Sequence, residues 1–392
     1  MKTNFIVLQI FFFLYLFHFT NSSSSPIISR FQEYLQINTS QPSPDYKKAT
    51  TFLLSQAQSL SLESQTFELA KNKPIVLLKW PGSNPYLPSI LLYSHTDVVP
   101  SEPEKWSHPP FGAHLDSEGN IFARGSQDMK CVGMQYLEAI RKLKTGGFQP
   151  VRTVYVAFAP DEEIGGHDGA EKFAESDVFK NMNVGVVLDE GISGSVYAER
   201  CPWWLVIKAR GAPGHGATCM IIVPWRTCLK ALESGLKGEG ESFRLTWFVM
   251  NLQPSEQKQV LIFEWAPASR NMTFEFKQKT SVHDKFGKPI ITATDISNPW
   301  WSLLEEAVKN ANGKLGKPEI FPASTDARYF RERGLPAIGF SPMANTPILL
   351  HDHNEFLNQA EYLKGIDIYE SIIKAYASYV QHTKEEISRD EL

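Results

Sequence analysis

Unbroken apolar runs that stop at acidic or histidine-containing segments predict the strands of a buried sheet in this chain. Ile90 to Tyr93 and Val184 to Leu188 are runs of this kind. They are typical of parallel strands that are covered on both faces. The strands predicted in this way are Pro74–Trp80, Ser89–Val99, Thr153–Ala159, Val184–Leu188 and Ala337–Phe340.

Segments with helical spacing of apolar residues alternate with these strands. Gly165-Gly166 opens one predicted helix, and Asn298-Pro299 supplies an N-cap and a first-turn proline for another. Alternation of strand and helix indicates an α/β domain with a central, mostly parallel sheet. The predicted helices are Ile27–Gln36, Tyr46–Ser59, Cys131–Lys144, Gly165–Ala174, Pro299–Asn312 and a closing helix that ends at Tyr379.

The pattern changes at Cys201, where alternation of apolar and polar residues replaces the buried runs. Trp203 to Ala209 reads as a half-buried strand, Trp225 to Leu236 as a helix, and Phe243 to Leu252 and Met272 to Phe276 as strands. We therefore predict a smaller α+β lid domain over residues 201–278. It is inserted into a larger domain that consists of residues 26–200 and 279–388.

Length and charge narrow the possible partners, and the two ends of the chain suggest a compartment. The chain has 392 residues, enough for two domains, and its net charge of −4 without a basic block argues against binding nucleic acid. Residues 1–25 have the charged start, apolar core and polar exit of a signal peptide. The apolar core is short for a bilayer span, so we expect no membrane anchor after its removal. Residues 389–392 resemble a retention tail, which predicts the endoplasmic reticulum lumen.

Cysteine chemistry is left open by the sequence. Disulfides are permitted in that compartment, but four cysteines allow three complete pairings and the spacing selects none of them. No Cys-x-x-Cys occurs, which argues against a zinc site made of thiolates. The four are Cys131, Cys201, Cys219 and Cys228.

Side chains that bind metals follow the predicted strands. His95 and Asp97 come after one buried run, Glu162 and Glu163 after a second, and Glu190 after a third. Ligands of open α/β sheets gather beyond the carboxyl ends of the strands, so we expect these side chains to lie together.

Two further segments complete a candidate metal site. Asp128 ends a glycine-containing segment just before a predicted helix, and either His351 or His353 is a candidate late in the chain. Two imidazoles and three carboxylates suit two zinc-like ions if one carboxylate bridges them. Glu162 would then be free to act as a general base, and Asp97 is placed to orient the imidazole of His95. The candidate ligands are His95, Asp128, Glu163, Glu190 and one of the two late histidines.

Several segments also carry motifs of a known family. They are Ser94 to Pro100, Arg124 to Lys130, Pro160 to His167, Leu188 to Gly191, Pro213 to Ala217, Ser324 to Tyr329 and Leu349 to His353. Together they resemble the aminoacylases of the M20 family, a group of di-zinc amidohydrolases and exopeptidases. The resemblance covers nearly all of Ile27 to Ser378 apart from one gap.

The resemblance implies hydrolysis of N-acyl-L-amino acids by a site with two Zn²⁺ ions. His95 and Glu190 would hold one ion, Glu163 and His351 the other, and Asp128 would bridge them. His351 is preferred over His353 because the family's spacing to Asn354-Glu355 fits it. By the same resemblance Asp97 orients His95, and Glu162 is the general base.

Contacts with the substrate are also implied by the resemblance. His215 is similar to a histidine that stabilises the oxyanion from the partner subunit of a homodimer. Asn251 aligns with an active-site asparagine, and Arg328 resembles a residue near the substrate carboxylate. A loop histidine and a structural arginine are the alternative interpretations of His215 and Arg328.

The gap in the resemblance falls in the predicted lid domain, between Ala217 and about Phe248. A four-stranded sheet with two crossing helices usually needs roughly 100 residues, whereas Trp203 to Lys277 provides 75. The lid domain is therefore predicted to be truncated, with an unpaired sheet edge that puts the homodimer in doubt. An M20 dipeptidase or carboxypeptidase, and a metal-binding but impaired homologue, remain alternatives to an active aminoacylase.

Overall fold

The computed structural model describes residues 25–191, 195–199, 201–209, 249–252, 272–279 and 281–380. Its centre is an eight-stranded sheet in the order β1-β2-β6-β3-β7-β13-β8-β12. The four middle strands β6, β3, β7 and β13 are parallel to one another, while β2 and β8 run antiparallel to their neighbours in this group. The strands are β1 (Glu63–Ala70), β2 (Lys73–Trp80), β3 (Ser89–His95), β6 (Val154–Ala159), β7 (Val184–Asp189), β8 (Ser195–Glu199), β12 (Glu319–Phe321) and β13 (Ala337–Phe340).

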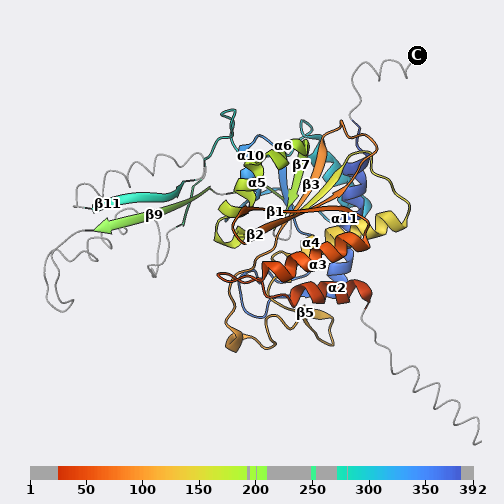
Figure 1. The fold of residues 1–392 in the computed structure, drawn as a ribbon, viewed down its shortest axis with the longest axis horizontal. Coiled ribbons are helices and arrows are strands. Elements are labelled where there is room, and N and C mark those ends of the chain that lie inside the picture. Colours follow the sequence, from red (N-terminus) through yellow and green to blue (C-terminus); the bar gives the residue numbers. More distant parts are fainter. Residues whose placement is uncertain are drawn as a thin grey trace, which may run out of the picture.

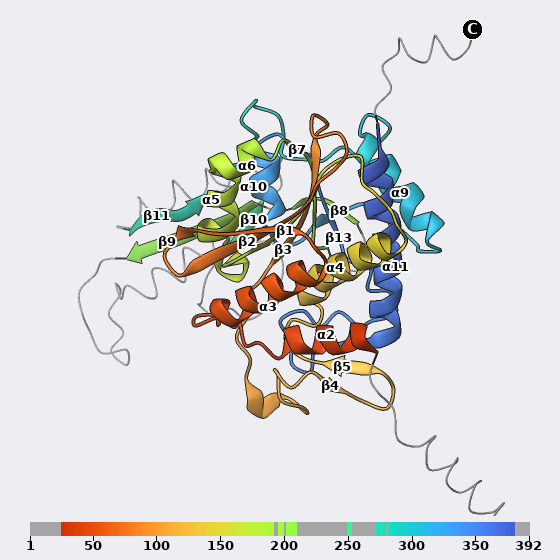
Figure 2. The same ribbon diagram turned by 45° about the vertical axis from the view of Figure 1, so that its right-hand side comes forward.

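Helices cover both faces of this sheet, and Figure 2 shows α2, α3 and α4 on one side and α5, α6 and α10 on the other. Alternate residues of β3 face the two layers, because side chains of a strand point to opposite faces. Ile90 and Leu92 join one core cluster and Leu91 and Tyr93 the other, all of them buried. The helices are α2 (Pro26–Leu35), α3 (Tyr46–Ser59), α4 (Lys130–Thr145), α5 (Lys172–Glu175), α6 (Asp177–Asn181), α9 (Pro299–Asn310), α10 (Ala327–Glu332) and α11 (Gln359–Ser378).

A small antiparallel sheet brings two distant loops together. It has the order β14-β5-β4, with β4 (His114–Leu115), β5 (Asn120–Phe122) and β14 (Phe356–Asn358). Phe122 pairs with Phe356 across β5 and β14. The loop that follows β5 and the loop that precedes β14 therefore start side by side, and both contribute to the site described below.

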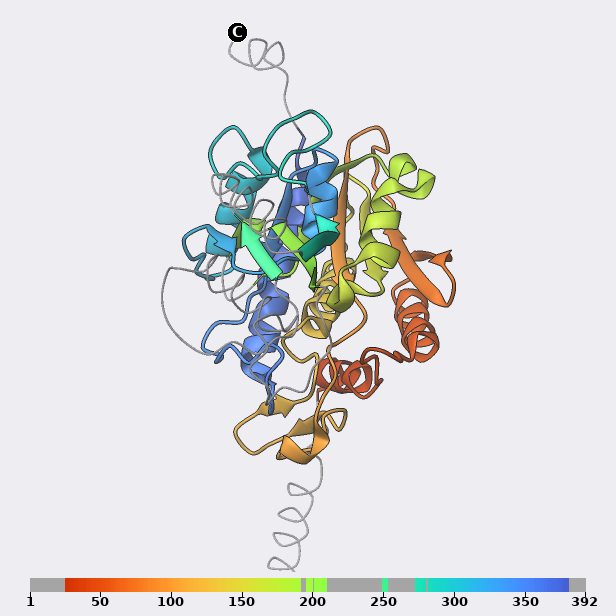
Figure 3. The same ribbon diagram turned by 90° about the vertical axis from the view of Figure 1, so that its left-hand side faces the viewer.

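A separate antiparallel sheet lies in the segment where the sequence predicts the inserted lid domain. Its described strands are β9 (Cys201–Ala209), β10 (Val249–Leu252) and β11 (Met272–Lys279), in the order β10-β9-β11. Figure 1 shows β9 and β11 to one side of the main sheet, and Figure 3 views the molecule from that side. The helix predicted over Trp225 to Leu236 lies outside the described residues, as do the ends 1–24 and 381–392.

The structure confirms the predicted α/β class with a central, mostly parallel sheet, but it corrects several details. The strand predicted over Ser89–Val99 ends at His95, because the chain then leaves the sheet towards Ser40, which bridges Val98. The helix predicted over Gly165–Ala174 is instead a π-helical turn (His167–Glu171) followed by the short α-helix α5. The predicted N-cap of α9 is confirmed, since the side chain of Asn298 accepts a hydrogen bond from Trp300 N.

Within the described residues, none of the helices combines the length and the apolar character that crossing a bilayer requires. Cys131 is buried and forms no disulfide with any cysteine among the described residues. Cys219 and Cys228 lie outside the described residues.

Candidate metal centre and active site

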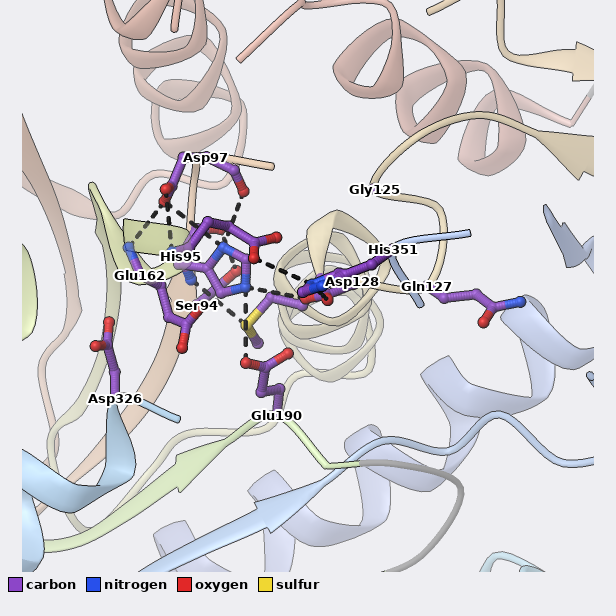
Figure 4. Close-up of polar contacts among 12 residues, drawn as sticks. Ser94, His95, Asp97, Gly125, Gln127, Asp128, Glu162, Glu190, Asp326 and His351 are labelled. Carbon is purple, nitrogen blue, oxygen red and sulfur yellow. Dashed lines mark hydrogen bonds and ion pairs between the residues drawn. The ribbon is translucent and has the colours of Figure 1, made fainter. Parts of the chain in front are cut away.

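Three neighbouring parallel strands deliver the site to one edge of the sheet. β3 ends at His95, β7 ends at Asp189 just before Glu190, and β6 leads into a turn that contains Glu162 and Glu163. Since β6, β3 and β7 are adjacent in the sheet, their carboxyl ends meet, which is where ligands bind in open α/β sheets. Figure 4 shows the side chains of His95, Glu162 and Glu190 pointing towards a common space.

Asp128 lies between the two predicted histidine ligands. One carboxylate oxygen, Oδ1, is 3.2 Å from His95 Nε2, and the other, Oδ2, is 3.0 Å from His351 Nε2. Glu190 Oε1 lies 3.7 Å from His95 Nε2, and Glu163 Oε2 lies 3.1 Å from His351 Nε2. The five residues thus form two groups of three that share Asp128.

Potential ligand atoms in each group lie within 4.8 Å of one another. One group is His95, Asp128 and Glu190, and the other is Asp128, Glu163 and His351. A further group joins His95 to Glu162 and Glu163. Imidazole nitrogens and carboxylate oxygens at this spacing are a donor set that suits zinc and similar divalent ions.

The electrostatics of the site fit bound cations. Burial raises the pKa of Glu190 well above its ordinary value, and the charge of Asp128 adds to this effect. Burial and the same neighbour raise the pKa of Glu163 to about 7. The Oε1 atom of Glu163 is buried and has no hydrogen-bond partner. Carboxylates that are crowded and partly unpaired in this way are stabilised when a cation shares their oxygens.

Asp97 contacts the imidazole of His95 mainly through its backbone. His95 Nδ1 donates to the carbonyl oxygen of Asp97 at 2.9 Å, whereas the Asp97 carboxylate is 3.7 Å away. A protonated Nδ1 leaves Nε2 free as the metal-binding nitrogen. The carboxylate instead accepts hydrogen bonds from the backbone N–H groups of Glu162 and Glu163, at 3.1 and 3.2 Å.

Glu355, which the sequence analysis did not select as a site residue, holds the loop that carries Asp128. Its buried carboxylate accepts from the backbone N–H groups of Gly125 and Gln127 at 3.1 and 2.6 Å, and from Asp128 N at 3.3 Å. It also pairs with the guanidinium of Arg124 at 2.7 Å. The only signal in the sequence is its distance of four positions from His351.

The structure describes the residues predicted to contact the substrate only in part. Arg328 is only 1 % exposed, and it donates to the carbonyl oxygens of Thr325 and Gly165 at 2.6 and 2.8 Å. In this arrangement it supports the protein backbone, and its contact with a substrate carboxylate stays a prediction. Asn251 lies in strand β10, and His215 lies outside the described residues.

His353, the alternative to His351, lies apart from both groups of ligands. Its Nε2 is 3.5 Å from Glu102 Oε2, and no metal-binding group among the described residues includes it. The geometry therefore favours His351 over His353 as the histidine of the second ligand group.

Two groups of potential metal ligands that share one carboxylate, at the carboxyl edge of an α/β sheet, are typical of a class of metallohydrolases. The chain belongs to the peptidase family M20/M25/M40, whose model matches residues 91–375. It is 42% identical to aminoacylase-1A of Rattus norvegicus over 400 residues, which cover 91% of this chain and 96% of the relative. It is 41% identical to aminoacylase-1 of Homo sapiens over 397 residues, which cover 90% and 96%. The resemblance to aminoacylases is thus confirmed, and the chain is a homologue of aminoacylase-1.

Solved structures confirm the fold class. An M20 family metallo-carboxypeptidase from Sulfolobus solfataricus matches with a TM-score of 0.69 at 16% identity, over 90% of this chain and 99% of that one. Human carnosine dipeptidase 1 matches with a TM-score of 0.63 at 13% identity, over 90% and 96%. A dinuclear metal-binding M20 peptidase from Bacillus subtilis has a TM-score of 0.60 at 15% identity, over 89% and 97%.

Proposed function

We propose that this chain is an aminoacylase, which hydrolyses N-acyl-L-amino acids to a carboxylate and a free L-amino acid. The observation that carries this function is the identity of 41–42% to aminoacylase-1 proteins over nine-tenths of the chain. The metal-ligand geometry agrees with it, because Asp128 lies between the two groups of ligands.

Zinc is the metal we assign to this site. His95 and Glu190 would hold one ion, Glu163 and His351 the other, and Asp128 both. When bound, such ions would polarise the amide carbonyl and lower the pKa of the attacking water. The nitrogen and oxygen donors, with no cysteine among them, match catalytic rather than structural zinc sites.

Glu162 is the base that we assign to the attacking water. It lies in the same turn as Glu163 and belongs to the group of potential ligands around His95. Among the residues that the structure describes, no lysine or arginine forms an ion pair with it. Desolvation raises its pKa well above the ordinary value of a glutamate, and the charge of Glu190 adds to this. A carboxylate with a raised pKa is a stronger base, and it can pass the proton on to the leaving nitrogen.

The test compares Glu162→Gln with the exposed control Glu104→Gln, both loaded with zinc. We expect Glu162→Gln to keep two ions per chain and to lose kcat by about 10²- to 10⁴-fold on N-acetyl-methionine, while the control matches wild type. Undiminished turnover by Glu162→Gln would remove it as the base. Wild-type protein that cleaves dipeptides but not N-acetyl-methionine would overturn the aminoacylase assignment in favour of a dipeptidase.

We also propose that the chain works in the endoplasmic reticulum lumen and that its short lid domain weakens the homodimer. The signal-like residues 1–25 and the tail 389–392 support the first proposal, and deletion of the tail should release the protein into the medium. The second is tested by light scattering during size-exclusion chromatography. A stable dimer at micromolar concentration would contradict it.

A further inference from the structure

The turn that carries both functional glutamates has an unusual backbone. This acidic turn, defined here as Asp161 to Gly166, has positive φ angles at Asp161 (67°), Gly165 (108°) and Gly166 (66°). The two glycines adopt such angles freely, and a Cβ at position 166 would lie 2.0 Å from Oδ1 of Asp326. Asp161 is not a glycine, so surrounding contacts have to hold it in the left-handed region.

Three side chains from the N-terminal part of the chain supply those contacts. The hydroxyl of Tyr46, the first residue of α3, donates to Asp161 Oδ1 at 2.7 Å and accepts from Asp161 N at 3.0 Å. Gln41 Nε2 donates to the same carboxylate at 3.2 Å. Lys73, the first residue of β2, forms an ion pair with Asp161 Oδ2 and reaches Asp168 Oδ2 at 2.7 Å.

The same group of side chains is connected to the centre of the turn. Gln41 Nε2 also donates to Asp97 Oδ2 at 2.8 Å. The Asp97 carboxylate in turn accepts from the backbone N–H groups of Glu162 and Glu163. A continuous chain of hydrogen bonds therefore leads from Tyr46 and Gln41 to the backbone of both glutamates.

We propose that Tyr46, Gln41 and Lys73 are positioning residues that set where Glu162 and Glu163 point. None of the three belongs to a group of potential metal ligands among the described residues, and each contacts Asp161, the residue directly before Glu162. The roles of the two glutamates as base and ligand are those of the proposed function, on which this inference rests. Since a small misplacement of a reacting group lowers the rate strongly, loosening the acidic turn impairs both catalysis and metal binding.

Tyr46→Phe is the most direct test, with Tyr376→Phe as the matched control. Both tyrosines are buried, 6 % and 0 % exposed, and both donate one hydrogen bond, that of Tyr376 to the carbonyl oxygen of Trp300 at 2.7 Å. Tyr46→Phe loses this bond and the one that its hydroxyl accepts from Asp161 N, whereas Tyr376→Phe loses one, so both variants lower the melting temperature and Tyr46→Phe lowers it further. A purely structural role of Tyr46 predicts the same kinetics and the same zinc affinity for both variants.

We expect Tyr46→Phe to bind zinc roughly tenfold more weakly and to lose kcat roughly tenfold, with KM within about twofold of wild type. Tyr376→Phe keeps wild-type values. Zinc affinity is measured by competition with a chelating dye. A fall in either quantity that is confined to Tyr46→Phe supports the proposal, and wild-type values for both overturn it.

Lys73 offers a second site for a test variant. Its side chain is 29% exposed, so its replacement disturbs the packing of the core less than that of Tyr46. Lys73→Met, like Tyr46→Phe, should bind zinc more weakly than wild type. Lys73→Arg, which keeps the positive charge, should bind zinc with the affinity of wild type. If wild-type protein fails to hydrolyse N-acetyl-methionine, the proposed function fails, but the zinc affinities still decide for or against the positioning role.

Discussion

Oδ2 of Asp128 lies 3.0 Å from Nε2 of His351, although the two residues come from distant parts of the chain. Pairing of β5 with β14 starts the two loops side by side, and Glu355 then ties its own loop to the backbone of Asp128. The second metal-binding group therefore depends on a contact between two loops, whereas His95 and Glu190 lie at the ends of adjacent strands.

Replacement of the two late histidines tests which of them is a ligand. His351→Asn removes one of three ligands from the second group, so we expect one zinc ion per chain in place of two and a loss of most activity. His353→Asn, only two positions away, should retain both ions. Metal content measured by atomic absorption after dialysis distinguishes them, and two ions in His351→Asn would contradict the assignment.

Zinc binding should depend on pH because zinc and protons compete for the same atoms. Hydrogen bonds to Asp128 and Glu163 raise the pKa of His351 to about 10, so its imidazole is protonated at neutral pH in the metal-free protein. Zinc binds only the neutral ring, and its binding therefore releases this proton. Apparent zinc affinity should rise by about tenfold per pH unit for each proton released, from pH 7 to about pH 9. Calorimetry in buffers of different ionisation enthalpy measures the released protons, and an affinity independent of pH would contradict the prediction.

The buried pair of Arg124 and Glu355 should be a major contributor to stability. Both side chains are almost fully buried, and the pair is 2.7 Å apart. Glu355→Gln leaves the guanidinium without its counter-charge, and we expect the free energy of unfolding to fall by about 3–5 kcal/mol. Chemical denaturation of the metal-free protein measures it. The control is Asp177→Asn, which breaks an exposed pair with Lys180 and should change stability little; equal effects of the two variants would contradict the prediction.

The parts of the structure that the sequence predicts well are those determined by local pattern. β3 and β7 were predictable because their apolar runs are buried whichever strands flank them. His95, which ends β3, and Glu190, which directly follows β7, could be predicted as ligands because the ends of parallel strands meet. β1 was not predicted, since Glu63 to Ala70 is an edge strand with exposed and half-buried residues and no continuous apolar run.

The parts that the sequence does not predict depend on contacts between distant residues. The carboxylate of Asp161, a residue in the left-handed conformation, accepts a hydrogen bond from Tyr46, which is 115 positions away. Arg328 was predicted at the substrate because its motif resembles that of the family, but its burial depends on Gly165 and Thr325, which receive its hydrogen bonds. Neither contact leaves a periodic pattern in the sequence.

The buried lysine next to the site gives a prediction about stability. Lys130 is the first residue of α4, and its Nζ donates to the carbonyl oxygens of Ile37 and Tyr34 at 2.6 and 3.2 Å. Burial lowers its pKa from 10.5 to about 7, although the charge of Glu355 acts in the opposite direction. Between these two values the unfolded chain binds more protons than the folded one, so this group makes stability rise with pH.

Lys130→Met removes this dependence and leaves the other titrating groups in place. The stability of wild type minus that of Lys130→Met should therefore increase from pH 7 to pH 10. Thermal unfolding of the metal-free proteins at several pH values measures the difference, with the exposed Lys309→Met on α9 as a control for loss of a surface charge. A difference between wild type and Lys130→Met that stays constant over this range would show that Lys130 keeps its proton in the folded protein, and the two carbonyl oxygens would then bind a permanent ammonium group.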